Sequence, residues 1–185
     1  MAEKQESYKK QFEDKVSFDH EPTREEFVAA VKGAIQSRSA LTWFVWKTLQ
    51  EEHPEIDATE VMGKAYRAFG RWYGEKWGEV EDAGEALCAQ SSKTGYAVFQ
   101  QQLSQISEDY AQKDFSFCPH MEMFEKLGAT AKERQTLCQD ILSEGDYGNL
   151  DVHPGLTLEF KTQIGAGADH CEYCVSKCPA AKDGE

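Results

Sequence analysis

The 185-residue sequence contains no long hydrophobic run, and none of its apolar stretches approaches the ~18–20 residues needed to span a bilayer. Its first residues, MAEKQESYKKQFEDK, are charged throughout, so a secretory signal is not expected there. The sequence also lacks a basic cluster, and 20 Lys and Arg stand against 33 Asp and Glu. Because a phosphate backbone needs clustered Lys and Arg, nucleic-acid binding is not expected. We predict a cytoplasmic globular protein that binds neither nucleic acid nor a membrane.

The composition that is present suits one packed domain. Hydrophobic residues make up 40% of the chain and aromatic residues 11%, which is enough for a core and excludes wholesale disorder. The formal net charge is −13, from 20 basic and 33 acidic residues. We divide the chain into a polar N-terminal arm (1–22), a single α+β domain (23–179) and a tail (180–185). No oligomeric state is predicted.

Helix signals dominate the first half of the chain. A capping pattern at Thr23 starts a first predicted helix, whose apolar stripe continues until His53-Pro54 interrupts it. Asp57 caps a second helix that runs to about Val80. Apolar residues at helical spacing then predict a third helix over residues 99–110.

Gly70 and Gly74 lie four residues apart inside the second predicted helix. Each glycine costs roughly 1 kcal/mol of helix stability relative to alanine, so their presence needs a reason. Small residues at this spacing let a second backbone approach closely. We therefore predict a tight helix contact at this face.

Further helix start and end signals follow after residue 115. Pro119 suits the first turn of a helix and Gly128 its end, and Thr130 caps another helix. Residues 144–149 are rich in glycine and polar side chains and predict a loop.

A β-hairpin is predicted near the C-terminus. Residues 155–164 alternate between apolar and polar, as a half-buried strand does, and residues 169–176 return as the partner strand. The fold class is therefore α+β, with a mainly helical body followed by a helix pair and a C-terminal antiparallel β-hairpin or small sheet.

Six cysteines occur in the chain, and three of them form the pattern C-x2-C-x3-C-P at Cys171, Cys174 and Cys178. This pattern offers three soft ligands to zinc or, less readily, to an iron–sulfur cluster, with Cys118 as a possible fourth ligand. On a strand, however, Cys171 and Cys174 point to opposite faces, so a shared metal needs a turn or bulge. Free thiols or a redox pair are the alternative.

Cys118 and His120 flank the proline that starts a predicted helix. A thiol before a helix N-terminus feels the positive end of the helix dipole, which predicts a lowered pKa and nucleophilic character. His120 is then a candidate base or ligand. The alternative is a buried cysteine before a proline-started helix and an exposed histidine.

Further candidates lie in and around the predicted hairpin. His153 stands in a Pro/Gly-locked loop, where a catalytic base or an ordinary surface histidine are equally compatible with the sequence. His170 is a second candidate base. Asp140 and Glu172 are candidates to orient a histidine or hold a cationic substrate, although an acid on a solvated surface is the common case.

Taken in order, these features resemble the L-2-amino-thiazoline-4-carboxylic acid hydrolase-like family. The resemblance extends from about Gln36 to Cys178. It is carried by Arg38-Ser-Ala40, Phe44 to Glu52, Lys64 to Gly74, Phe117-Cys-Pro119, Leu127-Gly128, Leu137-Cys138-x-Asp140, His153-Pro-Gly-Leu156 and Gly167 to Tyr173. Cys174 and Cys178 depart from the usual pattern at the end, which favours a metal or redox role.

The resemblance implies hydrolytic opening of a small cyclic amidine ring, giving a carbamoyl-cysteine type product. The matching positions Cys118, Asp140 and Cys171 are then candidates for catalysis. His153 or His170 would activate water, or Cys118 would attack directly.

Binding roles follow from the charges of such a substrate. Asp140 or Glu172 would pair with the protonated amidine, and Arg38 or Arg71 would hold a carboxylate. The alternative function is a metal- or cofactor-binding accessory or sensor protein that uses the C-terminal cysteines without turnover.

Overall fold

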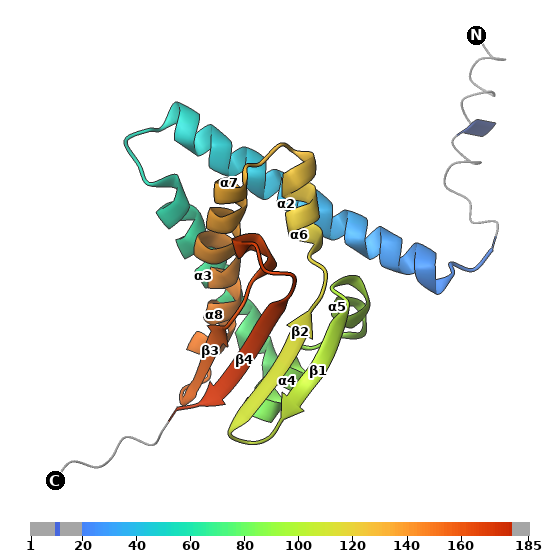
Figure 1. The fold of residues 1–185 in the computed structure, drawn as a ribbon, viewed down its shortest axis with the longest axis vertical. Helices are drawn as coiled ribbons and strands as arrows, with labels where there is room; N and C mark the ends of the chain where they lie inside the picture. The colour runs from blue at the N-terminus through green and yellow to red at the C-terminus, as the bar shows by residue number, and fades with distance from the viewer. Residues whose placement is uncertain (1–9, 12–19, 179–185) are drawn as a thin grey trace.

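The computed structural model describes residues 10–11 and 20–178 (Figure 1). Most of the predicted N-terminal arm and all of the predicted tail lie outside these residues. In the described part, helices pack behind and above a four-stranded antiparallel sheet. The predicted α+β class is confirmed.

The first half of the described chain is mostly helical, and the sheet strands follow in two pairs. The helices and helical turns are α2 (Arg24–Glu52), α3 (Ala58–Gly74), η1 (Glu75–Trp77), α4 (Ala83–Gln90), α5 (Lys93–Val98), α6 (Pro119–Lys126), α7 (Ala131–Thr136), the π-helical η2 (Leu137–Leu142), α8 (Ser143–Asp151) and η3 (Ile164–Ala166). The strands are β1 (Gln101–Ile106), β2 (Tyr110–Phe115), β3 (Leu156–Phe160) and β4 (Cys171–Lys177).

The helix starts predicted from capping residues are confirmed. Thr23 and Glu26 form a capping box at the start of α2, and Thr130 and Glu133 form one at α7. The Asp57 side chain accepts a hydrogen bond from the Glu60 amide at the start of α3. These caps satisfy backbone amides that the first turn of a helix leaves unpaired.

The predicted third helix over residues 99–110 is wrong, because this segment forms β1 and the turn into β2. Leu103 and Ile106, which contributed to the predicted helix face, are 60% and 45% exposed. The register shifts between Leu103 and Gln105, which breaks the two-residue alternation of the strand. Apolar residues three apart in this edge strand therefore imitate a helical stripe.

The predicted loop over residues 144–149 is also wrong, because these residues belong to α8, which packs against α3. A Cβ atom on Gly70 would clash with the carbonyl oxygen of Gly145, and one on Gly74 with that of Asn149. The predicted close contact at Gly70 and Gly74 is thus confirmed. The glycines of α8 serve the same contact rather than a turn.

The strand order is β1-β2-β4-β3. The predicted C-terminal hairpin is present as β3 and β4, and β4 also pairs with β2, which completes the sheet. Within this register Tyr173 of β4 lies between Lys113 of β2 and Phe160 of β3. Helices α4 and α8 contact the strands from one side and cover the core beneath them.

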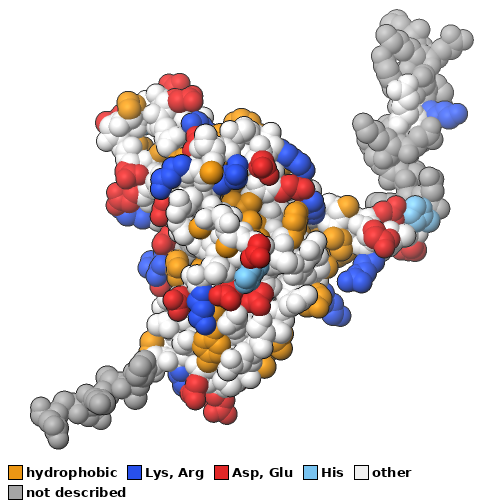
Figure 2. Space-filling view, viewed as in Figure 1, with side chains coloured by type: hydrophobic (Ala, Val, Ile, Leu, Met, Phe, Trp, Pro, Cys, Tyr) orange, Lys and Arg blue, Asp and Glu red, His pale blue; other side chains and the backbone are white. Residues whose placement is uncertain are grey.

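Several large apolar side chains lie outside the core. Phe69 and Trp72 of α3 are 49% and 53% exposed, because the glycine face of this helix is the one that packs. Figure 2 shows hydrophobic side chains reaching the surface between acidic and basic ones. Within the described ranges, no helix has both the length and the apolar character that crossing a membrane requires.

Candidate functional site

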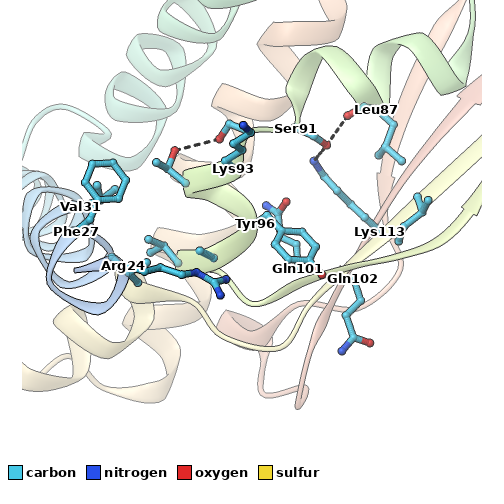
Figure 3. A pocket seen from close by; sticks show the side chains of 16 residues that line it. Arg24, Phe27, Val31, Leu87, Ser91, Lys93, Tyr96, Gln101, Gln102 and Lys113 are labelled. Carbon is cyan, nitrogen blue, oxygen red and sulfur yellow. Dashed lines mark hydrogen bonds between the residues drawn. The ribbon is translucent and has the colours of Figure 1, made fainter. Parts of the chain in front are cut away.

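A hollow of about 740 Å³ opens between the first turns of α2, helices α4 and α5, and strands β1 and β2 (Figure 3). Most of its surface is apolar. It is lined by Arg24, Phe27, Val28, Val31, Leu87, Ser91, Ser92, Lys93, Thr94, Tyr96, Ala97, Val98, Gln101, Gln102, Leu103 and Lys113.

Lys113 enters the wall of this hollow from β2. Alternate residues of a strand share one face, and Ala111 and Lys113 both turn inward, so the lysine is only 3% exposed. A buried ammonium group must be hydrogen-bonded. Its Nζ donates to Ser91 Oγ at 2.8 Å and to the side-chain oxygen of Gln90, both at the C-terminal end of α4.

Gln90 links the lysine to a carboxylate on α8. Its Nε2 donates to Asp146 Oδ1 in a long hydrogen bond of 3.5 Å, while its carbonyl oxygen accepts from Lys113. The chain of contacts is therefore carboxylate, amide, amine and hydroxyl, running from Asp146 to Ser91. We call these four side chains (Asp146, Gln90, Lys113 and Ser91) the polar relay.

Burial shifts the titration of both ionisable groups in the polar relay. It lowers the pKa of Lys113 to about 8, although the negative charge of Asp146 opposes this. It raises the pKa of Asp146 to about 6, against the opposing effects of the Lys113 charge and the Gln90 hydrogen bond. The neutral amine of Lys113 is thus accessible near physiological pH.

A hydroxyl beside an amine of lowered pKa is an arrangement that can produce a nucleophile. Ser91 Oγ donates to the Leu87 carbonyl oxygen at 2.6 Å, which holds the hydroxyl beside Lys113 (Figure 3). Nearby in the same core, the buried Tyr173 hydroxyl has no hydrogen-bond partner in the described part of the chain. Burial keeps the pKa of Tyr173 well above its usual range, so this group stays a donor.

The polar relay was not predicted from the sequence. Its members come from α4 and its C-cap, from β2 and from α8. Residues 144–149 of α8 were predicted as a loop, and no strand was predicted at residues 110–115. One signal existed: Lys113 stands between Ala111 and Phe115 in alternation, which places a charge on the apolar face of a strand. That signal becomes readable only once residues 110–115 are recognised as a strand.

Cys118 caps α6 and lies in a core cluster close to Cys138 and Cys171. The predicted lowering of its pKa is wrong, because burial raises the pKa of this thiol to about 12. Hydrogen bonds from the backbone amides of Met121 and His120 act in the predicted direction and are outweighed. Burial also raises the pKa of Cys138 and Cys171.

His120 turns away from Cys118 toward α2. Its Nδ1 lies 2.7 Å from Ser39 Oγ, and the ring lies beside Phe99. Burial and then the charge of Arg38 lower the pKa of His120 to about 3, so the ring is neutral. Arg38 itself is exposed and does not line the 740 Å³ hollow.

His153 is buried at another part of the molecule. Its Nε2 donates to the Gly74 carbonyl oxygen at 3.2 Å, and its ring stacks on Trp77 with centroids 5.4 Å apart. It borders a smaller hollow of about 310 Å³, together with Asp151. Arg71 donates from Nε to Asp151 at 2.8 Å, so this arginine is already paired.

The remaining acid–base candidates lie at the surface. His170 contacts Asp169 at 2.5 Å and Glu172 at 3.6 Å, and the hydrogen bond to Asp169 raises the pKa of His170. Asp140 is exposed on η2. The structure therefore places Cys118 close to Cys171 and His170 beside Glu172, whereas His153 lies at another part of the molecule and Asp140 is exposed. None of these residues lines the 740 Å³ hollow.

The predicted metal centre is not supported. Among residues 10–11 and 20–178, no group of three or more Cys, His, Asp or Glu side chains is arranged to hold a metal ion. Cys171 faces the core, where Sγ accepts from the Ile164 amide, whereas Cys174 lies on the other face and accepts from the Tyr110 hydroxyl. Cys178 is exposed beyond β4. Strand alternation separates the ligands, because β4 has no bulge between Cys171 and Cys174.

A family model described as L-2-amino-thiazoline-4-carboxylic acid hydrolase matches residues 34–175. No curated protein matches the chain. The matched range includes the whole polar relay and leaves out the first turns of α2, which form one wall of the hollow.

Proposed function

The chain belongs to the L-2-amino-thiazoline-4-carboxylic acid hydrolase family, and from this we propose that it hydrolyses a carbon–nitrogen bond in a small cyclic amidine. The product is of the carbamoyl-cysteine type. The family supports the reaction class, and the hollow supports a site for it. The observation that carries the proposal is the 2.8 Å contact between Lys113 Nζ and Ser91 Oγ at the wall of that hollow.

In the proposed reaction, the Ser91 hydroxyl turns from the Leu87 carbonyl oxygen toward neutral Lys113, which removes its proton as Oγ attacks the amidine carbon. The new carbon–oxygen bond gives a tetrahedral intermediate. When this collapses, the ring carbon–nitrogen bond breaks, and the Lys113 ammonium returns its proton to the departing nitrogen. Water then attacks the carbon bound to Ser91, releases the serine hydroxyl and leaves the carbamoyl product.

Asp146 and Gln90 act as positioning residues in this scheme. Gln90 holds Lys113 through its carbonyl oxygen and is itself held by Asp146. The negative charge of Asp146 favours the ammonium form of Lys113, which is the form that exists after the proton has been taken. The relay therefore resembles a nucleophile and base that are oriented by a third group.

The experiment is turnover of 2-amino-thiazoline-4-carboxylate, with the product identified by mass spectrometry. Ser91→Ala and Lys113→Met are expected to lower kcat/KM at least 100-fold, because they remove the nucleophile or its base. Ser37→Ala, at an exposed position of α2, is the matched serine control and keeps native turnover. Circular dichroism of each variant checks that the fold is retained.

A Cys118→Ala variant separates this scheme from thiolate attack. With its raised pKa, Cys118 is expected to be dispensable, so the variant keeps turnover. Full activity in Ser91→Ala, or loss of activity in a folded Cys118→Ala, would contradict the assignment. Saturable binding without any product would instead indicate a ligand-binding protein.

A further inference from the structure

Among the residues that the structure describes, the charged ones that line the 740 Å³ hollow are all basic. Arg24, Lys93 and Lys113 contribute to its surface, and no described aspartate or glutamate does. This is unexpected in a chain with 33 acidic and 20 basic residues. The hollow is thus a local positive region in a protein of net charge −13.

Two of these cations are unpaired in the described part of the chain. Arg24 and Lys93 form no ion pair with a carboxylate there, whereas Lys32 and Lys47, further along α2, pair with Glu122 and Glu133. Figure 3 shows the Arg24 side chain extending from α2 toward the side of the hollow where Tyr96 and Gln101 lie. A guanidinium group in this position can hold a carboxylate through two parallel hydrogen bonds.

The walls between the cations are apolar. The apolar lining residues include Phe27 and Val31 of α2, Tyr96 and Val98 of α5, and Leu103 of β1. Phe27, Tyr96 and Leu103 are 51%, 55% and 60% exposed, so their apolar surface is left uncovered. Burying such surface is favourable at about 25 cal/mol per Å².

The volume of the hollow exceeds what a single five-membered ring fills. Pockets of about 300–1,000 Å³ enclose ligands of drug size, and this one measures about 740 Å³. The wall formed by Arg24, Phe27, Val28 and Val31 lies before the range that matches the family model. The apolar enlargement of the site is therefore a feature of this chain beyond the matched range.

We propose that the hollow binds a monocarboxylate with an apolar body larger than the thiazoline ring, with Arg24 at the carboxylate and the α2 and α5 side chains around the apolar part. This inference rests on the proposed function in taking the hollow as the substrate site. Its test measures binding rather than turnover, so the two can fail separately.

The test is isothermal titration calorimetry of the full chain with butanoate, hexanoate, octanoate, octan-1-ol and octylamine. Affinity for the carboxylates is expected to rise about fourfold per added methylene until the hollow is filled. Octan-1-ol is expected to bind at least tenfold more weakly than octanoate, because it lacks the charge that Arg24 holds. Octylamine should bind more weakly still.

Variants assign the binding to the hollow. Arg24→Gln is expected to weaken octanoate about tenfold and leave octan-1-ol unchanged. Lys132→Gln, which removes an exposed lysine outside the hollow, is the matched control and should change neither. Ala97→Leu narrows the hollow and should weaken octanoate more than butanoate. Ser37→Ala, at an exposed position of α2 outside the hollow, should bind octanoate as the native chain does, whether or not the native chain turns over the thiazoline.

Three results would overturn the proposal. They are absence of saturable octanoate binding, equal affinity for octanoate and octan-1-ol, and unchanged octanoate affinity in a folded Arg24→Gln variant. If the native chain hydrolyses the thiazoline but fails in these titrations, the proposed function stands and the ligand class is wrong. If the titrations succeed without turnover, the reverse holds.

Discussion

The Lys113 side chain is held away from water by groups from three elements. Strand β2 carries it, the C-terminal end of α4 supplies Gln90 and the C-cap residue Ser91, and α8 supplies the charge of Asp146. Placing a lysine in such a site disfavours its charged form, so the site has a cost in stability that a neutral side chain would not have. Ionisable groups whose pKa is shifted by burial are common at functional sites.

Removing the charge of Asp146 is predicted to move the pH profile of turnover. kcat/KM should rise with pH as Lys113 loses its proton, with an apparent pKa near 8. Because the Asp146 charge raises the pKa of Lys113, Asp146→Asn should shift this profile to lower pH. The measurement is kcat/KM between pH 5 and 10 for both proteins.

The unfolding free energy gives a second readout of the same lysine. Its pKa is lower in the fold than its usual value of 10.5, so the unfolded chain binds more protons between pH 8 and 10.5. The stability contribution of Lys113 therefore rises with pH through this window, by roughly 3 kcal/mol if the shift is complete. Lys113→Met removes this contribution, and equal pH dependence of native and variant urea unfolding would contradict it.

Residues of the site were predictable only in part. The sequence around Pro119 was enough to place Cys118 at the start of a helix. Whether burial or the helix dipole controls the pKa of its thiol depends on tertiary packing, which the local sequence does not show. The same limit applies to Ser91 and Asp146, which carry no local signal. They meet Lys113 through tertiary contacts alone.

At the scale of elements, the contact between α3 and α8 depends on glycine. The two backbones approach so closely at Gly70 that the neighbouring atoms are the carbonyl of Gly145 and the Cα atom of Gly148. Backbone atoms cannot rotate out of the way as a side chain can. The register of the two helices is thereby fixed, and with it the position of Asp146 under the sheet.

Gly70→Ala is predicted to destabilise the protein by about 3 kcal/mol or more, since the new methyl group overlaps backbone of α8. Gly33→Ala is the matched control, because Gly33 also lies inside a helix, α2, and a Cβ atom there meets nothing within 4 Å. It should stabilise the protein by about 0.5–1 kcal/mol. Urea unfolding of both variants measures the difference, and similar effects of the two substitutions would refute this packing role.

Elements with strong local signals were predicted well. A few neighbouring residues are enough to predict the helix caps at Thr23, Asp57 and Thr130 and the apolar–polar alternation of strand β3. β1 was predicted as a helix because Leu103 and Ile106 are spaced as on one helix face. α8 was predicted as a loop because it contains glycines. In both cases a tertiary partner decides the structure.

At the scale of the whole molecule, the hollow joins the start of α2 to the rest of the fold. Its walls come from α2 on one side and from α5, β1 and β2 on the other. A ligand in the hollow would add contacts across this opening. The first turns of α2 should therefore gain the most from binding.

Hydrogen exchange is predicted to show this effect. With octanoate bound, backbone amides of residues 27–31 should exchange at least severalfold more slowly, because opening of this turn would expose the ligand. Residues 131–136 of α7 do not line the hollow and serve as the internal control. Mass spectrometry of peptides from the exchanged protein measures both, and slowing confined to α7 would argue against binding in the hollow.

The order of the strands bears on how this protein is made. β4 is the last described strand in the chain, yet it lies in the interior of the sheet between β2 and β3. During synthesis on the ribosome, β1 and β2 emerge early and leave one edge of β2 open until residues 171–177 appear. A nascent-chain chaperone that shields exposed strand edges would contact this edge of β2 only until β4 pairs with it.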